Sequence, residues 1–279
     1  MQNNQDLIPQ NFLNKQEFLA QDFLTQEFLE NEKKFLEKNK LVKITENDNV
    51  IIDVPYARND NFCETKLYSH PFIYCHEDAY QSLKILVENL KKENLKLKIF
   101  DGFRPYKVQA FMAEKFPNFV DEGYVSHPIE GIATHVRGIA LDITLVKDAE
   151  ELAMGTKFDE MSPKAHYQTE GLSAEQISNR QLLRHHMIKA GFEPYENEWW
   201  HFNLPIFNKN KSGEIIGAIE EKDKKYPKIF KDFPVLCSSE VNEFYEKKTL
   251  KYPSQNKSCS CFFYNALNSL KKIFISNAR

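Results

Sequence analysis

Apolar residues recur with a helical period in two stretches of the chain. In EDAYQSLKILVENLKKEN (77–94) they stand three and four residues apart, at Ala79, Leu83, Leu86, Val87 and Leu90. That spacing places them on one face of a helix. SAEQISNRQLLRHHMIKAG (173–191) begins with a Ser-x-x-Gln capping box and ends at Gly191, so it is predicted to be a second helix.

Three other stretches have the pattern of strands. VIIDVPYA (50–57) and LKLKIFDGFRP (95–105) each begin as a strand and run into a loop. GIALDITLV (138–146) is the clearest strand, with Ile139, Leu141, Ile143 and Leu145 on one face and Ala140, Asp142 and Thr144 on the other. Strands and helices mix without a regular βαβ period. We therefore expect an α+β fold over residues 41–208, with a mainly antiparallel central sheet and flanking helices.

Residues 1–40 are a Phe-rich extension. Short NFL, EFL, DFL and KFL motifs recur every five to seven residues, at Phe12, Phe18, Phe23, Phe28 and Phe35. Because a helix advances about 100° per residue, steps of five turn the Phe side chains around the axis. We expect neither a clean amphipathic helix nor a heptad seam. The segment is interpreted as a low-complexity extension that partly folds onto the domain, with self-association or partner binding as the alternative.

Residues 209–279 form a basic extension, with 14 Lys and Arg against 8 Asp and Glu. Near its end, apolar residues recur at helical spacing beside three basic residues: Phe263, Leu267, Leu270 and Phe274, flanked by Lys271, Lys272 and Arg279. The pattern predicts an amphipathic helix that packs back on the domain. The alternative is contact with an anionic membrane surface or a groove of a partner protein.

Bulk composition narrows the functional classes. The 279 residues carry a net charge of −3, so nothing points to nucleic acid as the main partner. No apolar run reaches the roughly 18–20 residues of a transmembrane helix, and the N-terminus lacks the features of a signal peptide. We therefore expect a soluble, cytoplasmic protein. The five Cys are expected to be free thiols, with a metal site at the Cys259–Cys261 pair as the weaker alternative.

Two stretches carry candidate catalytic chemistry. GIATHVRGIALD ends at Asp142, seven residues after His135, and ENEWWHFN places Glu198 three residues before His201. A catalytic zinc site takes three protein ligands and leaves one position for water, whose proton a nearby carboxylate can accept. Two imidazoles, a carboxylate ligand and a spare carboxylate are therefore the set to look for. Each piece alone also fits a structural interpretation, as a core His–Asp pair or as an aromatic core strand with a satisfied His.

The spacing of Glu198 and His201 raises a geometric problem. In a regular strand, residues three apart point to opposite faces of the sheet. We therefore expect Glu198 at a bend or loop just before the strand. The motif H-E-x-x-H is absent from the chain, which excludes the helical zinc-protease arrangement.

Six ordered motifs carry a resemblance to a known family. They are YARNDNF (56–62), DGFRP (101–105), THVRGIALDITL (134–145), MGTKFDEM (154–161), NRQLLRHHMIKAGFE (179–193) and EWWHF (198–202). Together they resemble the zinc D-alanyl-D-alanine dipeptidases of the vancomycin-resistance type, which belong with the D,D- and L,D-peptidases of peptidoglycan. The resemblance covers roughly residues 50–208 and says nothing about the two extensions.

The resemblance implies a metal centre and a reaction. One zinc ion per chain would be held by His135, Asp142 and His201, and Glu198 would be the general base. The implied reaction is zinc-dependent hydrolysis of the D-Ala-D-Ala dipeptide, a small-molecule substrate.

The resemblance also implies the residues around the substrate. Arg104 would stabilise the oxyanion that forms on the scissile carbonyl. Asp159 and Tyr56 would hold the free ammonium group, which favours a dipeptide over a longer chain. Without the resemblance, Arg104 would be interpreted as a surface ion pair and Asp159 as a turn residue or helix cap.

One position departs from the family pattern. Ala133 stands where the family has a Ser near the carboxylate of the substrate. The hydroxyl of Thr134 is next to it but is expected to point elsewhere, so metal binding should survive while affinity and substrate choice stay open. His127, His185 and His186 match no ligand position and are expected to be solvated.

Two other functions stay open at this stage. The chain would be a D,D- or L,D-carboxypeptidase or endopeptidase if it acts on longer peptidoglycan peptides. It would be a non-catalytic zinc fold if it acts only in interactions, through the Phe-rich N-terminus and the basic tail.

Overall fold

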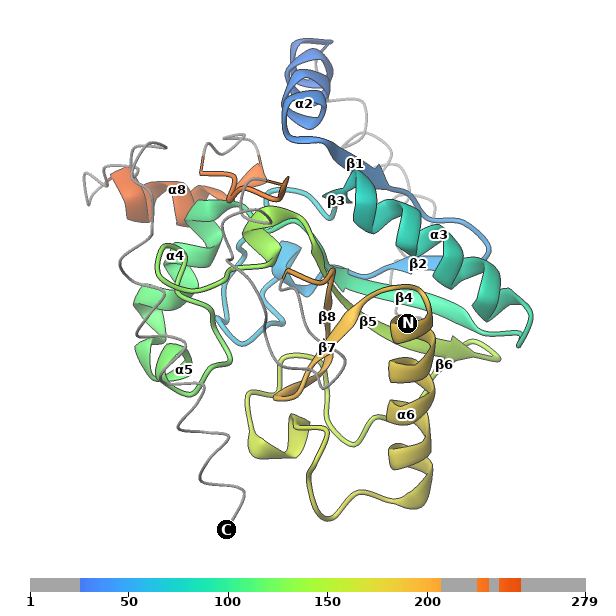
Figure 1. The fold of residues 1–279 in the computed structure, drawn as a ribbon. Coiled ribbons are helices and arrows are strands. Elements are labelled where there is room, and N and C mark those ends of the chain that lie inside the picture. Colours follow the sequence, from blue (N-terminus) through green and yellow to red (C-terminus); the bar gives the residue numbers. More distant parts are fainter. Residues whose placement is uncertain (1–25, 207–224, 231–235, 247–279) are drawn as a thin grey trace, which may run out of the picture. The chain divides into compact units, whose positions relative to one another are not determined.

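The computed structural model describes residues 26–206, 225–230 and 236–246 (Figure 1). Contacts divide the chain into two compact units, Met1–Lys40 and Leu41–Arg279. In the first unit, α2 (Gln26–Asn39) is a helix, which the uneven Phe spacing did not predict. Seven residues separate Phe28 from Phe35, and a step of seven returns to nearly the same side of a helix. The earlier Phe repeats lie outside the described residues.

The second unit is built on a six-stranded sheet. Its strand order is β2 (Val50–Ile52), β4 (Lys96–Asp101), β5 (Ala140–Lys147), β8 (Glu198–Asn203) and β7 (Glu193–Tyr195), with β6 (Glu150–Glu151) paired to β5. The pair β2–β4 is parallel and the other pairs are antiparallel. A separate two-stranded antiparallel sheet joins β1 (Leu41–Ile44) to β3 (Ile73–His76). The predicted α+β fold with a mainly antiparallel sheet is confirmed.

Helices flank this sheet (Figure 1). Contacts join α3 (Glu77–Lys91) to α6 (Ala174–Lys189), α3 to β4, and α6 to β7. Next to α4 (Tyr106–Lys115) lie α5 (Pro117–Asp121) and α8 (Ser239–Glu246). Short 3-10 turns occupy Pro55–Ala57 (η1), His135–Arg137 (η2) and Pro163–Ala165 (η3).

Both helices predicted from the sequence are present. Four of the five apolar positions predicted on one face of α3 are buried: Ala79, Leu83, Leu86 and Leu90. The capping box of α6 forms as predicted, because the Ser173 hydroxyl accepts from the backbone of Gln176 and the Gln176 side chain accepts from the backbone of Ser173. Gly191 follows the helix with a φ of 96°, a conformation that favours glycine.

The centre of the sheet is β5, which lies between β4 and β8. The strand begins at Ala140, two residues later than predicted, because Gly138 ends the η2 turn with a φ of 69°. Neither face of the strand meets solvent from Ala140 to Val146, and Asp142 and Thr144 are as deeply buried as their apolar neighbours. Asp142 therefore presents its carboxylate inside the protein, where it needs a cation or hydrogen-bond donors.

Two described pieces of the C-terminal region belong to the second unit. Ile229 donates its backbone N–H to Val136, and Ser238 donates to Leu67. The boundary predicted at residue 208 stays a prediction, and the amphipathic helix predicted over 263–274 lies outside the described residues. So do Cys259 and Cys261, while Cys63, Cys75 and Cys237 form no disulfide.

Candidate metal centre

Three side chains from separate segments converge beside β5. His135 comes from η2, Asp142 from β5, and His201 from the position on β8 that is paired with Asp142. His135 Nε2 lies 3.1 Å from His201 Nδ1 and 3.3 Å from Asp142 Oδ2, and His201 Nδ1 lies 3.0 Å from Asp142 Oδ1. One possible ligand atom from each of the three residues lies within 4.8 Å of the other two. The sequence predicted this set, and the fold brings all three together.

These distances suit a divalent metal ion. Four ligands at about 2.0–2.1 Å in a tetrahedral site lie roughly 3.3 Å from one another. His135 Nδ1 is 2.7 Å from the carbonyl oxygen of Gly102, so it carries the ring proton and leaves the Nε2 lone pair facing the cluster. Two imidazoles and a carboxylate are a donor set that zinc and related divalent ions accept. The residues therefore fit a metal ion.

Electrostatics favours the protonation states that metal ligands require. Burial opposes ionisation of Asp142, yet the two imidazoles beside it hold its pKa below the ordinary range. Burial lowers the pKa of His201, although Asp142 acts in the opposite direction. An ionised carboxylate and a neutral imidazole are the forms that bind a metal.

Thr134 is a partner of His201 that the sequence did not reveal. Its Oγ1 lies 3.3 Å from His201 Nε2, on the side of the ring away from Asp142. With Nε2–H donated to this hydroxyl, the Nδ1 lone pair faces the cluster. The Thr134 hydroxyl contacts a candidate metal ligand. This contact is a physical reason for the expectation that Thr134 does not take the place of the family Ser. Ala133 beside it has a φ of 49°, which is unusual for a residue with a side chain.

Glu198 lies beside this cluster with an unusual acidity. Its Oε2 is 3.9 Å from His201 Nδ1, and the side chain is buried. Burial first, and then the negative charges of Asp142 and Asp159, raise its pKa well above the ordinary range. A carboxyl group with a raised pKa is suited to accept and return a proton.

The expected position of Glu198 before the strand is wrong. Glu198 is the first residue of β8 and pairs with Tyr195, whereas Phe202 pairs with the preceding residue of β7, Pro194. The partners of two adjacent residues of β7 are thus four residues apart on β8. This irregularity breaks the alternation of the two faces, so Glu198 and His201 can both face the cluster.

Arg104 is buried next to the candidate ligands. Its Nε and Nη2 donate to Asp101 Oδ2 at 2.9 and 2.8 Å, and Nη1 donates to Gln109 Oε1 at 3.1 Å. Nη2 also lies 3.6 Å from Asp142 Oδ2. The interpretation as a surface ion pair is therefore wrong, because the guanidinium is fixed inside the site. Asp101 stands in the DGFRP motif, but the role of Gln109 had no signal in the sequence.

Tyr56 and Asp159 meet on another side of the site. The Tyr56 hydroxyl donates to Asp159 Oδ1 at 3.0 Å, and the Arg104 guanidinium lies 5.2 Å from the Tyr56 ring centroid. Asp159 Oδ2 is buried and has no hydrogen-bond partner among the described residues. Burial raises the pKa of Asp159 well above the ordinary range. Its backbone φ is 62°, so this buried acid also sits in a strained turn.

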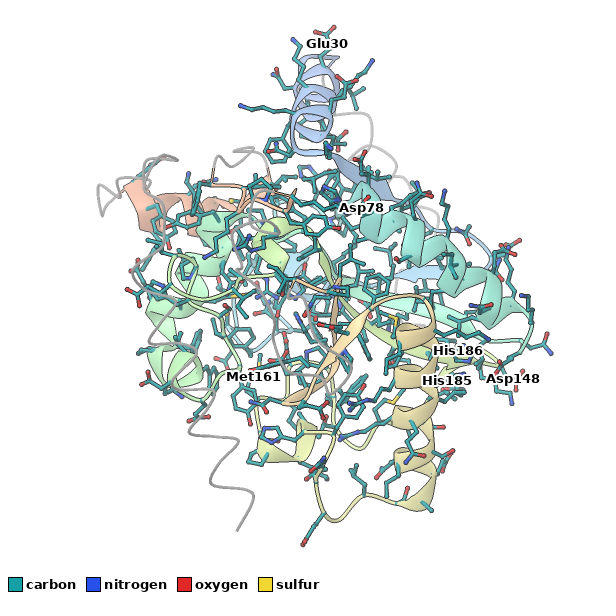
Figure 2. All side chains as sticks on the ribbon, viewed as in Figure 1. Glu30, Asp78, Asp148, Met161, His185 and His186 are labelled. Carbon is teal, nitrogen blue, oxygen red and sulfur yellow. The ribbon has the colours of Figure 1, made fainter. Side chains whose placement is uncertain are left out.

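The three histidines that were expected to be solvated have different surroundings. His185 is exposed on α6, as expected, and His127 Nδ1 accepts hydrogen bonds from the backbone of Ile129 and Glu130. His185 and His186 follow one another on α6 (Figure 2). The expectation of a solvated His186 is wrong, since it is 1% exposed. Its Nε2 lies 3.3 Å from Glu93, because α6 packs against α3 at this point.

A buried His–Asp–His cluster with an adjacent carboxyl group and a fixed arginine is suited to metal-dependent hydrolysis. Residues 37–213 match the model of a family described as D-ala-D-ala dipeptidase. The chain belongs to that family and is a metallopeptidase.

Curated relatives agree with the family match. The chain is 34% identical to a D-alanyl-D-alanine dipeptidase of Escherichia coli over 155 residues, which cover 55% of this chain and 78% of the relative. It is 31% identical to a D-alanyl-D-alanine dipeptidase of Enterococcus faecium over 205 residues, or 66% and 91% of the two chains. A family of this kind acts on a small peptide. Across the described residues, no helix has the length and hydrophobicity to cross a bilayer.

Proposed function

We propose that this chain is a zinc-dependent D,D-dipeptidase that hydrolyses free D-Ala-D-Ala. The convergence of His135, Asp142 and His201 within hydrogen-bond distance of one another, with Glu198 beside them, is the observation that carries the proposal. The names of the relatives support the choice of substrate.

Each residue of the cluster has a defined task in this proposal. His135 Nε2, Asp142 and His201 Nδ1 would hold one zinc ion per chain. Bound zinc would supply a Lewis acid that lowers the pKa of water to about 7. Glu198 accepts the proton of the attacking water at a carboxylate oxygen and returns it to the amine that leaves. Its buried position keeps that proton away from bulk solvent.

Arg104 acts on the carbonyl oxygen of the substrate. The tetrahedral intermediate places negative charge on this oxygen, and a guanidinium already fixed by Asp101 and Gln109 needs no reorganisation to stabilise it. Since all three nitrogen atoms of Arg104 already have partners, its position is set before substrate binds.

Asp159 and Tyr56 select the amino end of the substrate. The unpartnered Oδ2 of Asp159 is a buried acceptor that a substrate ammonium group would satisfy. Tyr56 donates to the other oxygen and orients the carboxyl group. A peptide whose amino group is blocked loses this ion pair, so the site favours a free dipeptide.

The direct test is incubation of the purified, zinc-loaded protein with D-Ala-D-Ala and with N-acetyl-D-Ala-D-Ala. We expect release of free D-Ala from the first and little from the second. Absence of release, with zinc shown to be bound, would reject a dipeptidase. Cleavage of the acetylated peptide would instead favour the carboxypeptidase alternative, which needs no free amino group.

Replacing Asp159 with Asn separates the function of this residue from its effect on stability. KM for D-Ala-D-Ala should rise about 30-fold, since loss of a buried charge partner costs about 2 kcal/mol or more. The free energy of unfolding at neutral pH should increase by about 1 kcal/mol. The folded-state pKa of Asp159 lies above its unfolded value, so ionisation above about pH 3.9 destabilises the folded protein, and Asn removes that penalty.

Steady-state kinetics and denaturant unfolding measure the two effects of Asp159→Asn. Asp60→Asn is the matched control, because Asp60 is an exposed carboxylate paired with Arg58. A variant of Asp159 with normal KM would remove this residue from substrate binding.

A further inference from the structure

A segment beyond the family match contacts the loop that carries His135. The match ends at residue 213, and residues 225–230, here called the clamp segment, lie after it. Four hydrogen bonds join the clamp segment to residues 129–137. Lys228 Nζ donates to the carbonyl oxygens of Ile129 at 2.5 Å and Gly131 at 2.6 Å. Ile229 N–H donates to Val136 at 3.0 Å, and Arg137 Nη1 donates back to the carbonyl of Tyr226 at 2.6 Å.

The other side of the clamp segment is fixed to α3. The Tyr226 hydroxyl donates to Asp78 Oδ2 at 2.8 Å, and Lys225 Nζ lies 2.9 Å from the same oxygen. Asp78 stands in the first turn of α3 (Figure 2). The Tyr226 ring packs edge-on against His76, with centroids 5.0 Å apart. The clamp segment therefore connects the His135 loop to a helix of the core.

The His135 loop needs such support because its own backbone is irregular. Ala133 has a φ of 49°, in the region that side chains with a Cβ disfavour. Hydrogen bonds within the loop region run from Gly131 N–H to His127 and from Ala133 N–H to the Ser126 hydroxyl. The clamp segment adds donors for three further carbonyl groups of the loop, at Ile129, Gly131 and Val136.

Lys228 is the clamp residue whose side chain contacts the loop twice. An ammonium group has three N–H donors, and two of those on Lys228 reach carbonyls on either side of Glu130. These carbonyls precede His135 by six and four residues. A side chain of similar length without donors leaves both carbonyls without this partner.

We propose that the clamp segment is a positioning element of the metal centre, and that Lys228 holds the loop so that His135 Nε2 stays directed at Asp142 and His201. The inference rests on the metal site of the proposed function and not on the identity of the substrate. It assigns a role to part of the chain that the family match leaves out.

The test is the affinity for zinc, measured by competition with a chromophoric chelator on the full-length protein. Lys228→Met should bind zinc about tenfold more weakly, the lower end of the range for groups that orient metal ligands. Hydrogen exchange should become faster in residues 129–137. Lys228→Arg should restore wild-type affinity, because a guanidinium offers two parallel donors.

Lys91→Met is the matched control. It removes an exposed lysine whose partner is Glu88 on α3, outside both the clamp segment and the His135 loop. We expect wild-type zinc affinity for this variant. Wild-type affinity and exchange in Lys228→Met would overturn the proposal, and so would equal losses in the two lysine variants.

Two further outcomes of the experiment can be distinguished, a variant that does not fold and a failure of the proposed function. If Lys228→Met does not fold, Lys228→Gln takes its place, and its single amide donor group should give an affinity between those of Met and Lys. Unchanged affinity there overturns the proposal as well. A wild-type protein that binds no zinc would reject both the metal centre and the proposed role of the clamp segment. Zinc binding without dipeptide cleavage would reject only the assigned substrate.

Discussion

Replacing Glu198 with Gln is expected to lower kcat for D-Ala-D-Ala by about 10²–10⁴, the range for loss of a general base. Gln has nearly the same shape but cannot accept the proton of the attacking water. Bound zinc should stay at one equivalent per chain, since the three candidate ligands are untouched. Metal analysis and the initial rate of D-Ala release measure the two quantities on the same sample.

The control for this experiment is Glu196→Gln. Glu196 lies two residues before Glu198 but is exposed and paired with Arg184 on the surface, so its loss should change kcat by less than about twofold. Normal turnover in Glu198→Gln would remove Glu198 as the base. Loss of zinc together with activity would instead place Glu198 among the groups that hold the metal.

Elements with a local signal could be predicted from the sequence. The period of apolar residues gave α3, and the capping box with Gly191 gave both ends of α6, because these features depend on residues three and four positions apart. The alternation in β5 gave the strand and the inward position of Asp142. The family motifs then named the three candidate ligands that the fold brings together.

Features that depend on distant partners could not be predicted in the same way. Glu198 faces the cluster because of an irregular pairing between β7 and β8, and a single strand sequence does not show its register against a neighbour. His186 is buried because α6 meets α3 next to Glu93, 93 residues away. The clamp segment follows a stretch of unremarkable basic sequence, and its role depends on which carbonyls Lys228 reaches.

The electrostatic character of the site also follows from the assembled fold. Four carboxyl groups, those of Asp101, Asp142, Asp159 and Glu198, are buried near one guanidinium, that of Arg104. The four acids respond to burial in three ways. Asp101 uses Arg104, Asp142 uses the imidazoles, and Asp159 and Glu198 have raised pKa values. Such divergent environments for similar groups are typical of acid–base catalysis and of substrate anchoring.

Replacing Arg104 with Lys is expected to lower kcat by about 10²–10³, the usual effect of losing one donor to an oxyanion. An ammonium group cannot contact Asp101 Oδ2 and Gln109 Oε1 at once with the geometry of the guanidinium. KM should change much less, because the charge on the carbonyl oxygen develops only as the transition state forms. Rates of D-Ala release over a range of dipeptide concentrations separate kcat from KM.

Arg58→Lys is the matched control, since Arg58 forms exposed ion pairs with Asp53 and Asp60 and should tolerate the change. A double-mutant cycle with Asp101→Asn then measures whether Asp101 contributes to activity through Arg104. If Asp101 acts through Arg104, the double variant should lose hardly more activity than Arg104→Lys alone, because the guanidinium that Asp101 positions is already gone. Additive losses would give Asp101 an independent role, and a rise in KM with unchanged kcat in Arg104→Lys would contradict stabilisation of the oxyanion.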